Sequence, residues 1–407
     1  MTASSKLSSK LPKQFSGKEV LVISLISAGH FLSHFYVICL APLLLQMAAD
    51  LKVGFAELGL ISTAFFAAGA TCQMPAGILV DRIGARRVLF VGMFILSIAI
   101  TFAGLTTSYW GLLGLFMLAG VGNCVFHPCD YVILSSSVDE KYLGRAFSIH
   151  SFCGSAGFAI SPVTMAALAV WFDWRTSLLI VGVGGLILAL IILTFQFSLK
   201  DSVTRKNKGK GQLWSTWHAL ISRRILSHFV YFTTSSAATS ALTAFTVVVL
   251  VAYYGVSEKY AGAVLTAYLI SASIGVIFGG ILADRTKRHD LVLIITMLVA
   301  AISTGIAATG ILSFWLCTLA LMVAGLTKGI VAPSRDLMVR NDAPAALLGS
   351  VVAFVTVGFT FGNGLAPVIA GWFVDKNAAL GVFWMASGLA LTAISCVLIA
   401  RRSAPPK

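Results

Sequence analysis

Apolar segments long enough to cross a membrane recur along the whole chain, and they constrain its fold more than any other feature. Each has roughly 20 or more residues, the length that a helix needs to cross a ~30 Å hydrocarbon core. Twelve can be counted, at residues 20–47, 56–80, 88–107, 109–137, 144–170, 175–198, 225–253, 259–283, 290–309, 312–337, 348–373 and 377–400. Because a helix satisfies its own backbone hydrogen bonds in lipid, the sequence predicts an all-α membrane protein.

The distribution of charge agrees with a membrane protein and excludes a nucleic-acid partner. Only 11% of the 407 residues are charged, 58% are hydrophobic, and the mean hydropathy is +0.93. The net charge is +14, but 23 of the Lys and Arg residues lie in the two tails and the even-numbered loops, against four in the odd-numbered loops. Basic residues accumulate on the cytoplasmic side of membrane proteins. We therefore expect a protein of the inner (cytoplasmic) membrane with both termini in the cytoplasm.

The chain divides into two halves that repeat each other. The longest connection between apolar segments falls midway, so we predict a six-helix bundle over residues 1–199, a cytoplasmic linker over 200–224 and a second bundle over 225–407. The segment that ends at Pro128 aligns with the segment that ends at Pro333, an offset of 205 residues. Such repeats are typical of transporters, whose substrate site lies at the interface of two pseudo-symmetric bundles.

A loop motif occurs once in each half. The loop after the second segment reads G-I-L-V-D-R-I-G-A-R-R over residues 77–87, and the loop after the eighth reads G-I-L-A-D-R-T-K-R over 280–288. Both resemble the G-x-x-x-D-R-x-G-R-R signature of the major facilitator superfamily. The resemblance implies the major facilitator fold and a transporter, not an enzyme, that opens a central site alternately to each side without a cofactor.

The same resemblance implies a role in gating for the acidic and basic residues of these loops. In the family, the acidic residue closes the cytoplasmic side by lying against the start of a helix from the other half. Asp81 and Asp284 match that position, and each is followed by an arginine, Arg82 and Arg285. A carboxylate near the free N–H groups of a helix start gains roughly 0.3–1 kcal/mol, which makes this role physically reasonable.

Two further motifs resemble particular branches of the superfamily. Gly29 with His30 and His34 in the first segment, and the sequence F-H-P that ends at Pro128 in the fourth, resemble the fosmidomycin-resistance-like branch. The fifth segment is similar to the G-x-x-x-G-P motif of antiporters, but Ser161 replaces the second glycine. The direction of transport therefore stays open.

Ionisable residues inside the apolar segments are candidates for function, because each costs about 2.5–3.5 kcal/mol to insert. They are His30, His34, His127, Asp130, His150, Lys328, Arg335 and Asp336. The family resemblance implies that the first, fourth, seventh and tenth helices line the central cavity. Of these residues only His150 lies on another helix, so we interpret it as a packed core histidine.

Depth along the helices separates the candidates into two layers. At ~1.5 Å per residue, His30 and Lys328 lie near the midplane of the membrane. Asn123 joins them because the 205-residue offset makes it equivalent to Lys328. The predicted substrate-binding residues are His30, His34, Asn123, His127 and Lys328. The predicted gating or coupling residues are Asp81, Arg82, Asp130, Asp284, Arg285, Arg335 and Asp336.

Asp130 and Arg335 occupy equivalent positions of the two halves, so we predict that they pair across the cavity when the cytoplasmic side is closed. The alternatives are local pairs of Arg335 with Asp336 or of Asp130 with Arg145. Imidazole groups exchange protons near neutral pH. Proton coupling is therefore expected to depend on His30, His34, His127 or Asp130.

A metal site at His30 and His34 is a less favoured alternative. These residues stand four apart and share a helix face, but the pattern lacks the glutamate of H-E-x-x-H, and the sequence has no second acidic cluster at the same depth. The charge of Lys328 needs compensation from elsewhere, because no carboxylate lies within one turn of it on its own helix. Either an anionic substrate compensates its charge, or the lysine is neutral.

The sequence thus predicts a monomeric secondary transporter in the lipid bilayer that moves a small solute, an organic anion, in exchange for or together with protons. No nucleotide-binding loop is present, so an ion gradient must supply the energy. Two alternatives stay open: a proton-coupled drug exporter, and an intramembrane metal-dependent enzyme that uses His30, His34 and His127.

The charge asymmetry makes a prediction about topology. With both termini inside, the central linker at Lys208 is cytoplasmic and Lys259 faces the outside. In intact cells, an impermeant thiol reagent is expected to label Lys259→Cys and not Lys208→Cys. The parent chain with its seven cysteines is the control. Labelling of Lys208→Cys from outside would contradict the assignment.

Overall fold

The computed structural model describes residues 15–200, 220–343 and 348–402, and these residues are helical apart from short turns. Twelve spans within these ranges are long and apolar enough to cross a membrane, which confirms the predicted fold class. The helices of the first half are α1 (Gly17–Val37), α2 (Leu44–Leu51), α3 (Phe55–Ile83), α4 (Ala85–Ala103), α5 (Tyr109–Asn123), α6 (Phe126–Ser137), α7 (Leu143–Trp171) and α8 (Trp174–Thr194). Those of the second half are α10 (Arg223–Tyr254), α11 (Glu258–Arg285), α12 (His289–Ala308), α13 (Phe314–Asp342), α14 (Leu348–Asp375) and α15 (Gly381–Arg402).

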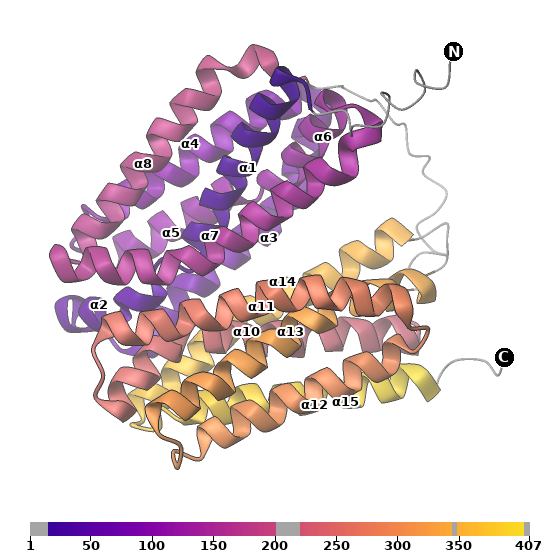
Figure 1. Cartoon of the computed structure of the whole chain (residues 1–407). Coiled ribbons are helices and arrows are strands. Elements are labelled where there is room, and N and C mark those ends of the chain that lie inside the picture. Colours follow the sequence, from indigo (N-terminus) through magenta and orange to yellow (C-terminus); the bar gives the residue numbers. More distant parts are fainter. Residues whose placement is uncertain (1–14, 201–219, 344–347, 403–407) are drawn as a thin grey trace, which may run out of the picture.

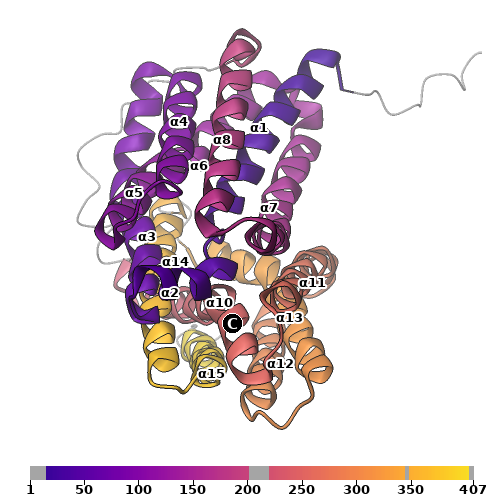
Figure 2. The same ribbon diagram turned by 90° about the vertical axis from the view of Figure 1, so that its left-hand side faces the viewer.

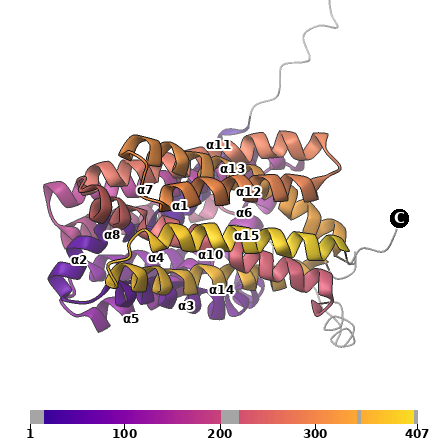
Figure 3. The ribbon, with the colours of Figure 1, turned by 90° about the horizontal axis from the view of Figure 1, so that it is seen from below.

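Two bundles are visible in Figures 1 and 2, one formed by α1 to α8 and the other by α10 to α15. Seen from below, the helices of both bundles run in roughly the same direction (Figure 3). Residues 201–219 lie outside the described part of the chain. The boundaries of the central linker therefore stay a prediction.

Two of the twelve spans are interrupted beside a proline. The first span breaks between α1 and α2 around Pro42, and the fourth breaks between α5 and α6, just before Pro128. Proline has no N–H to donate to the carbonyl of the residue four positions earlier, and its ring clashes with that carbonyl. The second break leaves Asn123 at the end of α5 and His127 at the start of α6.

The two halves meet at one end and diverge towards the end where α1 begins and α15 ends (Figure 1). We call the end at which they meet the closed end. There, Gln46 of α2 donates to Glu258 of α11 at 3.1 Å, and Thr63 of α3 donates to the carbonyl of Gly364 on α14. The charge asymmetry predicts that both termini lie in the cytoplasm, and in that orientation the closed end would face outside.

A helix cap provided by the opposite half holds the closed end. The Asp375 carboxylate, at the end of α14, accepts hydrogen bonds from the N–H groups of Phe55 (2.7 Å) and Ala56 (2.8 Å) at the start of α3. These N–H groups have no partner within their own helix, and the helix dipole favours a negative charge beside them. The contact forms only while the halves are together at this end.

Removal of this cap is expected to weaken the closed end. Asp375→Asn should cost about 1 kcal/mol. Double electron–electron resonance between spin labels at residues 53 and 376 is then expected to show about a fivefold larger population of long distances. Asp173→Asn is the control, because Asp173 caps α8 within one half by accepting from the N–H of Thr176 at 2.9 Å. An unchanged distance distribution in Asp375→Asn would contradict this role.

Candidate functional site

A cavity of about 330 Å³ lies between the two halves, with walls from both. Four of the five predicted substrate-binding residues line it, namely His34, Asn123, His127 and Lys328. Its other polar lining residues are Ser62, Thr239, Ser240, Thr243 and Asn363, and its aromatic ones are Phe66, Phe158, Phe245 and Phe359. A second cavity of about 180 Å³ also borders Lys328 and extends along α13 to Arg335.

Lys328 is the cation of the central cavity, and the structure gives it no fixed partner. It is half-buried on α13, and within the described residues no carboxylate lies in ion-pair range of its ammonium group. Arg335, two turns further along α13, is occupied by its neighbour: its guanidinium Nε donates to Asp336 Oδ1 at 2.9 Å. A half-buried ammonium group without a counter-ion favours the approach of an anion.

Asn123 and His34 add hydrogen-bonding capacity to the same cavity. Asn123 Oδ1 and His34 Nδ1 are buried, and neither has a hydrogen-bond partner among the described residues. His127 is exposed to the cavity, three residues beyond the start of the break between α5 and α6. The proline-induced break thus turns two polar side chains towards one space.

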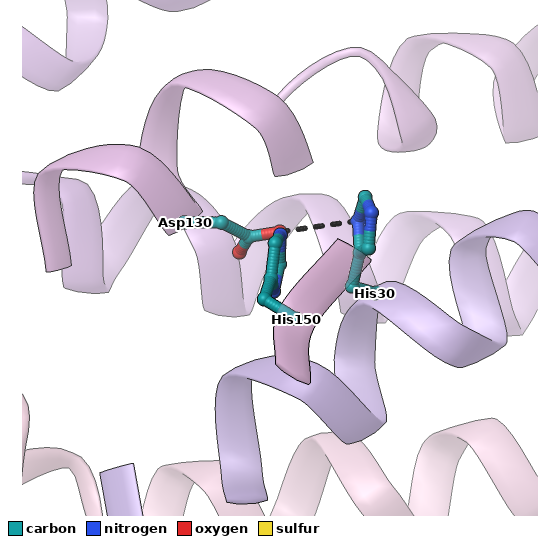
Figure 4. A group of neighbouring side chains, drawn as sticks. All are labelled: His30, Asp130 and His150. Carbon is teal, nitrogen blue, oxygen red and sulfur yellow. Dashed lines mark ion pairs between the residues drawn. The ribbon is translucent and has the colours of Figure 1, made fainter. Parts of the chain in front are cut away.

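Behind this cavity lies a cluster of His30, Asp130 and His150, shown in Figure 4. The side chains come from α1, α6 and α7, and the three residues are only 4%, 1% and 6% exposed. Asp130 Oδ2 lies 3.4 Å from His30 Nδ1 and 3.5 Å from His150 Nε2. The two imidazole rings are stacked, with centroids 3.9 Å apart and planes inclined by 22°.

His30 links this cluster to the cavity. Its ring centroid lies 4.2 Å from that of His34 and 5.2 Å from that of His127, and both of these histidines line the cavity. Helix α7 can approach α1 here because glycines face α1. A Cβ at Gly157 would lie 2.1 Å from the carbonyl oxygen of Phe31.

The structure brings together three residues to which the sequence analysis gave different roles. His150 was interpreted as a packed core histidine; it is buried, and it stacks on His30. Asp130 was predicted to be a gating or coupling residue nearer the cytoplasm than His30, but its carboxylate lies beside His30 and His150. His30 was predicted to bind substrate; it lies behind the cavity lining, and its role stays a prediction. One available signal was missed: Asp130 follows His127 by three residues and so shares its helix face.

The predicted pair of Asp130 and Arg335 is absent among the described residues, where Arg335 forms the local pair with Asp336 instead. That prediction concerned a molecule closed at the other end, so it stays a prediction for that conformation.

The predicted loop gates also stay predictions. Arg82, Asp284 and Arg285 are exposed at the ends of α3 and α11, and the described part of the chain offers these three side chains no ion pair. The Asp81 side chain and residues 344–347, before its expected partner helix α14, lie outside the described residues.

Comparison with known proteins decides the family. The family model of the Major Facilitator Superfamily matches residues 26–252 and 228–407, which together cover most of the chain. The chain belongs to the Major Facilitator Superfamily. It is therefore a multi-pass membrane transporter of small molecules, which excludes the alternative of an intramembrane enzyme.

Several members of the superfamily are similar over most of their length. The hexuronate transporter of Bacillus subtilis (strain 168) is 24% identical over 371 residues, 86% of each chain. The D-galactonate transporter of Escherichia coli O6:H1 is 24% identical over 381 residues, 84% of this chain and 86% of that protein. Multidrug resistance protein MdtH of Cronobacter sakazakii is 24% identical over 318 residues, 75% of this chain and 74% of that protein.

A solved structure confirms the major facilitator fold. A bacterial homologue of the human lysosomal transporter Spinster, in an inward-facing and occupied conformation, aligns with a TM-score of 0.77 over 97% of this chain and 98% of that chain. The two sequences are 16% identical, so the similarity concerns the fold alone.

The contact between α7 and α1 predicts the effect of a small substitution. A Cβ at Gly154 would lie 2.6 Å from His30 Cδ2 and Nε2 and 3.0 Å from His34 Nδ1. Since His30 is packed against other rings, Gly154→Ala should lower the free energy of unfolding by about 1–3 kcal/mol. The measurement is thermal unfolding of purified protein in detergent. Gly184→Ala on α8, with nothing within 4 Å, is the control. Equal stability of the two variants would contradict the packing.

Proposed function

We propose that this member of the superfamily moves a small organic anion of the sugar-acid class through the central cavity by alternating access, coupled to protons. The observation that carries the proposal is Lys328, an ammonium group in a cavity shared by both halves that has no carboxylate in ion-pair range among the described residues. An isolated charge in such a setting is costly, and a bound carboxylate compensates it through a charge-assisted hydrogen bond.

The other polar groups of the cavity suit a substrate with several hydroxyl groups. Thr239, Ser240 and Thr243 each donate their hydroxyl hydrogen to a backbone carbonyl, at 3.1, 2.9 and 3.0 Å. Their oxygen lone pairs remain available to accept from a ligand. Asn123 and His34 add further polar atoms on the opposite wall. The similarity to hexuronate and D-galactonate transporters supports the same class of substrate.

A proton-coupled drug exporter is the rival within the superfamily, and the similarity to MdtH together with the four phenylalanines of the cavity favours it. Lys328 argues against cationic drugs as substrates, because an ammonium group in the cavity repels a cation. The motifs that resemble the fosmidomycin-resistance-like branch leave a phosphonate as another anion that Lys328 could bind.

The transport cycle follows from the arrangement of the halves. In the orientation that we propose, with the termini in the cytoplasm, the structure is closed to the outside by the contacts around Asp375. Closure of the opposite end, in which Asp81, Asp284 and the pair of Asp130 and Arg335 are the proposed contacts, would expose the cavity to the outside. The chain works as a monomer in the lipid bilayer.

A binding experiment with purified protein tests the proposal. D-galactonate, L-galactonate and D-galacturonate are expected to raise the melting temperature, and the neutral sugar D-galactose is the control for the carboxylate. Lys328→Ala should weaken binding of the active sugar acid about 10- to 100-fold, the value of one charge-assisted hydrogen bond. Lys328→Arg keeps the charge with a different shape and should bind with intermediate affinity. Normal binding by Lys328→Ala would refute the anion proposal.

A further inference from the structure

We propose that Asp130, His30 and His150 form the proton-binding site of this transporter, separate from the substrate cavity and one layer behind it. The coupling role of the site rests on the proposed function, whereas proton binding by the three residues does not. All three belong to the first half, on α1, α6 and α7. Lys328 belongs to the second half. The proposed proton and anion sites therefore lie on opposite sides of the interface between the two halves, which move relative to each other during transport.

The charge of Asp130 has no fixed compensation. Both carboxylate oxygens are buried, and among the described residues neither has a hydrogen-bond partner. The groups in ion-pair range of Asp130, within the same part of the chain, are the imidazoles of His30 and His150. A buried carboxylate without a cation costs several kcal/mol. A proton can remove this cost, either on the carboxyl group or on an adjacent imidazole.

Because the two imidazoles are stacked, the site can take up only one proton more than the two neutral rings already carry. With centroids 3.9 Å apart, two cationic rings would repel each other strongly in a medium of low dielectric constant. One proton, by contrast, can move between Asp130 Oδ2 and either ring nitrogen by small side-chain rotations, since both separations exceed a hydrogen bond by only a few tenths of an ångström.

The same three residues offer atoms of the kind that bind zinc, and these atoms lie within 4.8 Å of one another. The ring geometry opposes a metal. A metal ion bound by an imidazole lies in the plane of the ring, along the nitrogen lone pair. Two rings that are stacked with an inclination of 22° cannot direct both lone pairs at one point. A proton, which binds one atom at a time, has no such requirement.

A path for the proton leads from the cavity to the cluster. The titratable groups that face His30 are His34 of its own helix, His127 and Asp130 of α6, and His150 of α7. Across the cavity, α13 presents Lys328 and Arg335. Each step transfers one proton from water or a ring N–H to the next lone pair. Access therefore follows the cavity, which opens to one side of the membrane at a time.

A second pair of histidine and aspartate, in which the histidine is buried and the aspartate is partly exposed, provides the control. His228 on α10 is 4% exposed, and its Nε2 lies 2.8 Å from Asp342 Oδ2. Here Arg224 Nη1 also lies 3.4 Å from Asp342 Oδ1, so a permanent cation compensates the carboxylate. Asp342 does not depend on a proton for its neutralisation, and His228→Gln should leave coupling unchanged.

Infrared difference spectroscopy during a pH titration of the purified protein tests proton binding without any substrate. The wild-type protein should show a C=O stretching band of a protonated carboxyl group, or imidazole bands, that Asp130→Asn removes and His228→Gln retains. His150→Gln should shift the titration midpoint of that signal. Identical infrared spectra for wild type and Asp130→Asn would overturn the proposal. A metal analysis that finds one equivalent of Zn²⁺ in wild type and none in Asp130→Asn would also overturn it.

Transport of D-galactonate into proteoliposomes tests the coupling role. A gradient of one pH unit, coupled to one proton per anion, should concentrate D-galactonate about tenfold in wild type and in His228→Gln. Asp130→Asn should exchange internal for external D-galactonate at equal pH, yet accumulate none when the gradient is imposed. Tenfold accumulation by Asp130→Asn would overturn the coupling role. If the wild type does not exchange D-galactonate, D-galactonate is refuted as the substrate. The infrared result would then still decide on proton binding.

Discussion

The cost of an unpaired charge in a medium of low dielectric constant governs the centre of this protein. A fixed ion pair would remove that cost once and for all. Instead, the structure keeps Asp130 in one half with imidazoles as its neighbours, and Lys328 in the other half without a carboxylate among the described residues. In our proposal each charge then depends on a mobile partner, a proton for Asp130 and an anion for Lys328. Transport of these two partners together would change no net charge.

Local features of the fold place these groups. Pro128 interrupts the fourth span, which brings Asn123 and His127 to the cavity from two helix ends instead of one helix face. Glycines on α7 let it approach α1 so closely that His150 stacks on His30. The contacts around Asp375 join the two halves at the closed end.

Most of the architecture could be predicted from the sequence because lipid imposes strict rules on it. Segment length and hydropathy sufficed for the twelve spans. Depth along the tenth helix placed Lys328, and the 205-residue offset then placed Asn123, among the residues that line the cavity. The position of His150 could not be predicted, because counting residues gives the depth of a side chain but not the direction in which its helix faces. The cap by Asp375 was also missed, since it joins residues 320 positions apart in the sequence.

The central claim is that an anion bound at Lys328 and a proton bound at Asp130 cross the membrane together. Counting the anions and the protons that enter tests this claim most directly. Proteoliposomes in a weakly buffered medium take up radiolabelled D-galactonate while an entrapped pH-sensitive dye reports the protons that enter with it. The account predicts one proton for each anion. A ratio of zero, with D-galactonate still entering, would show that the protonation of Asp130 has no part in transport and would contradict the account.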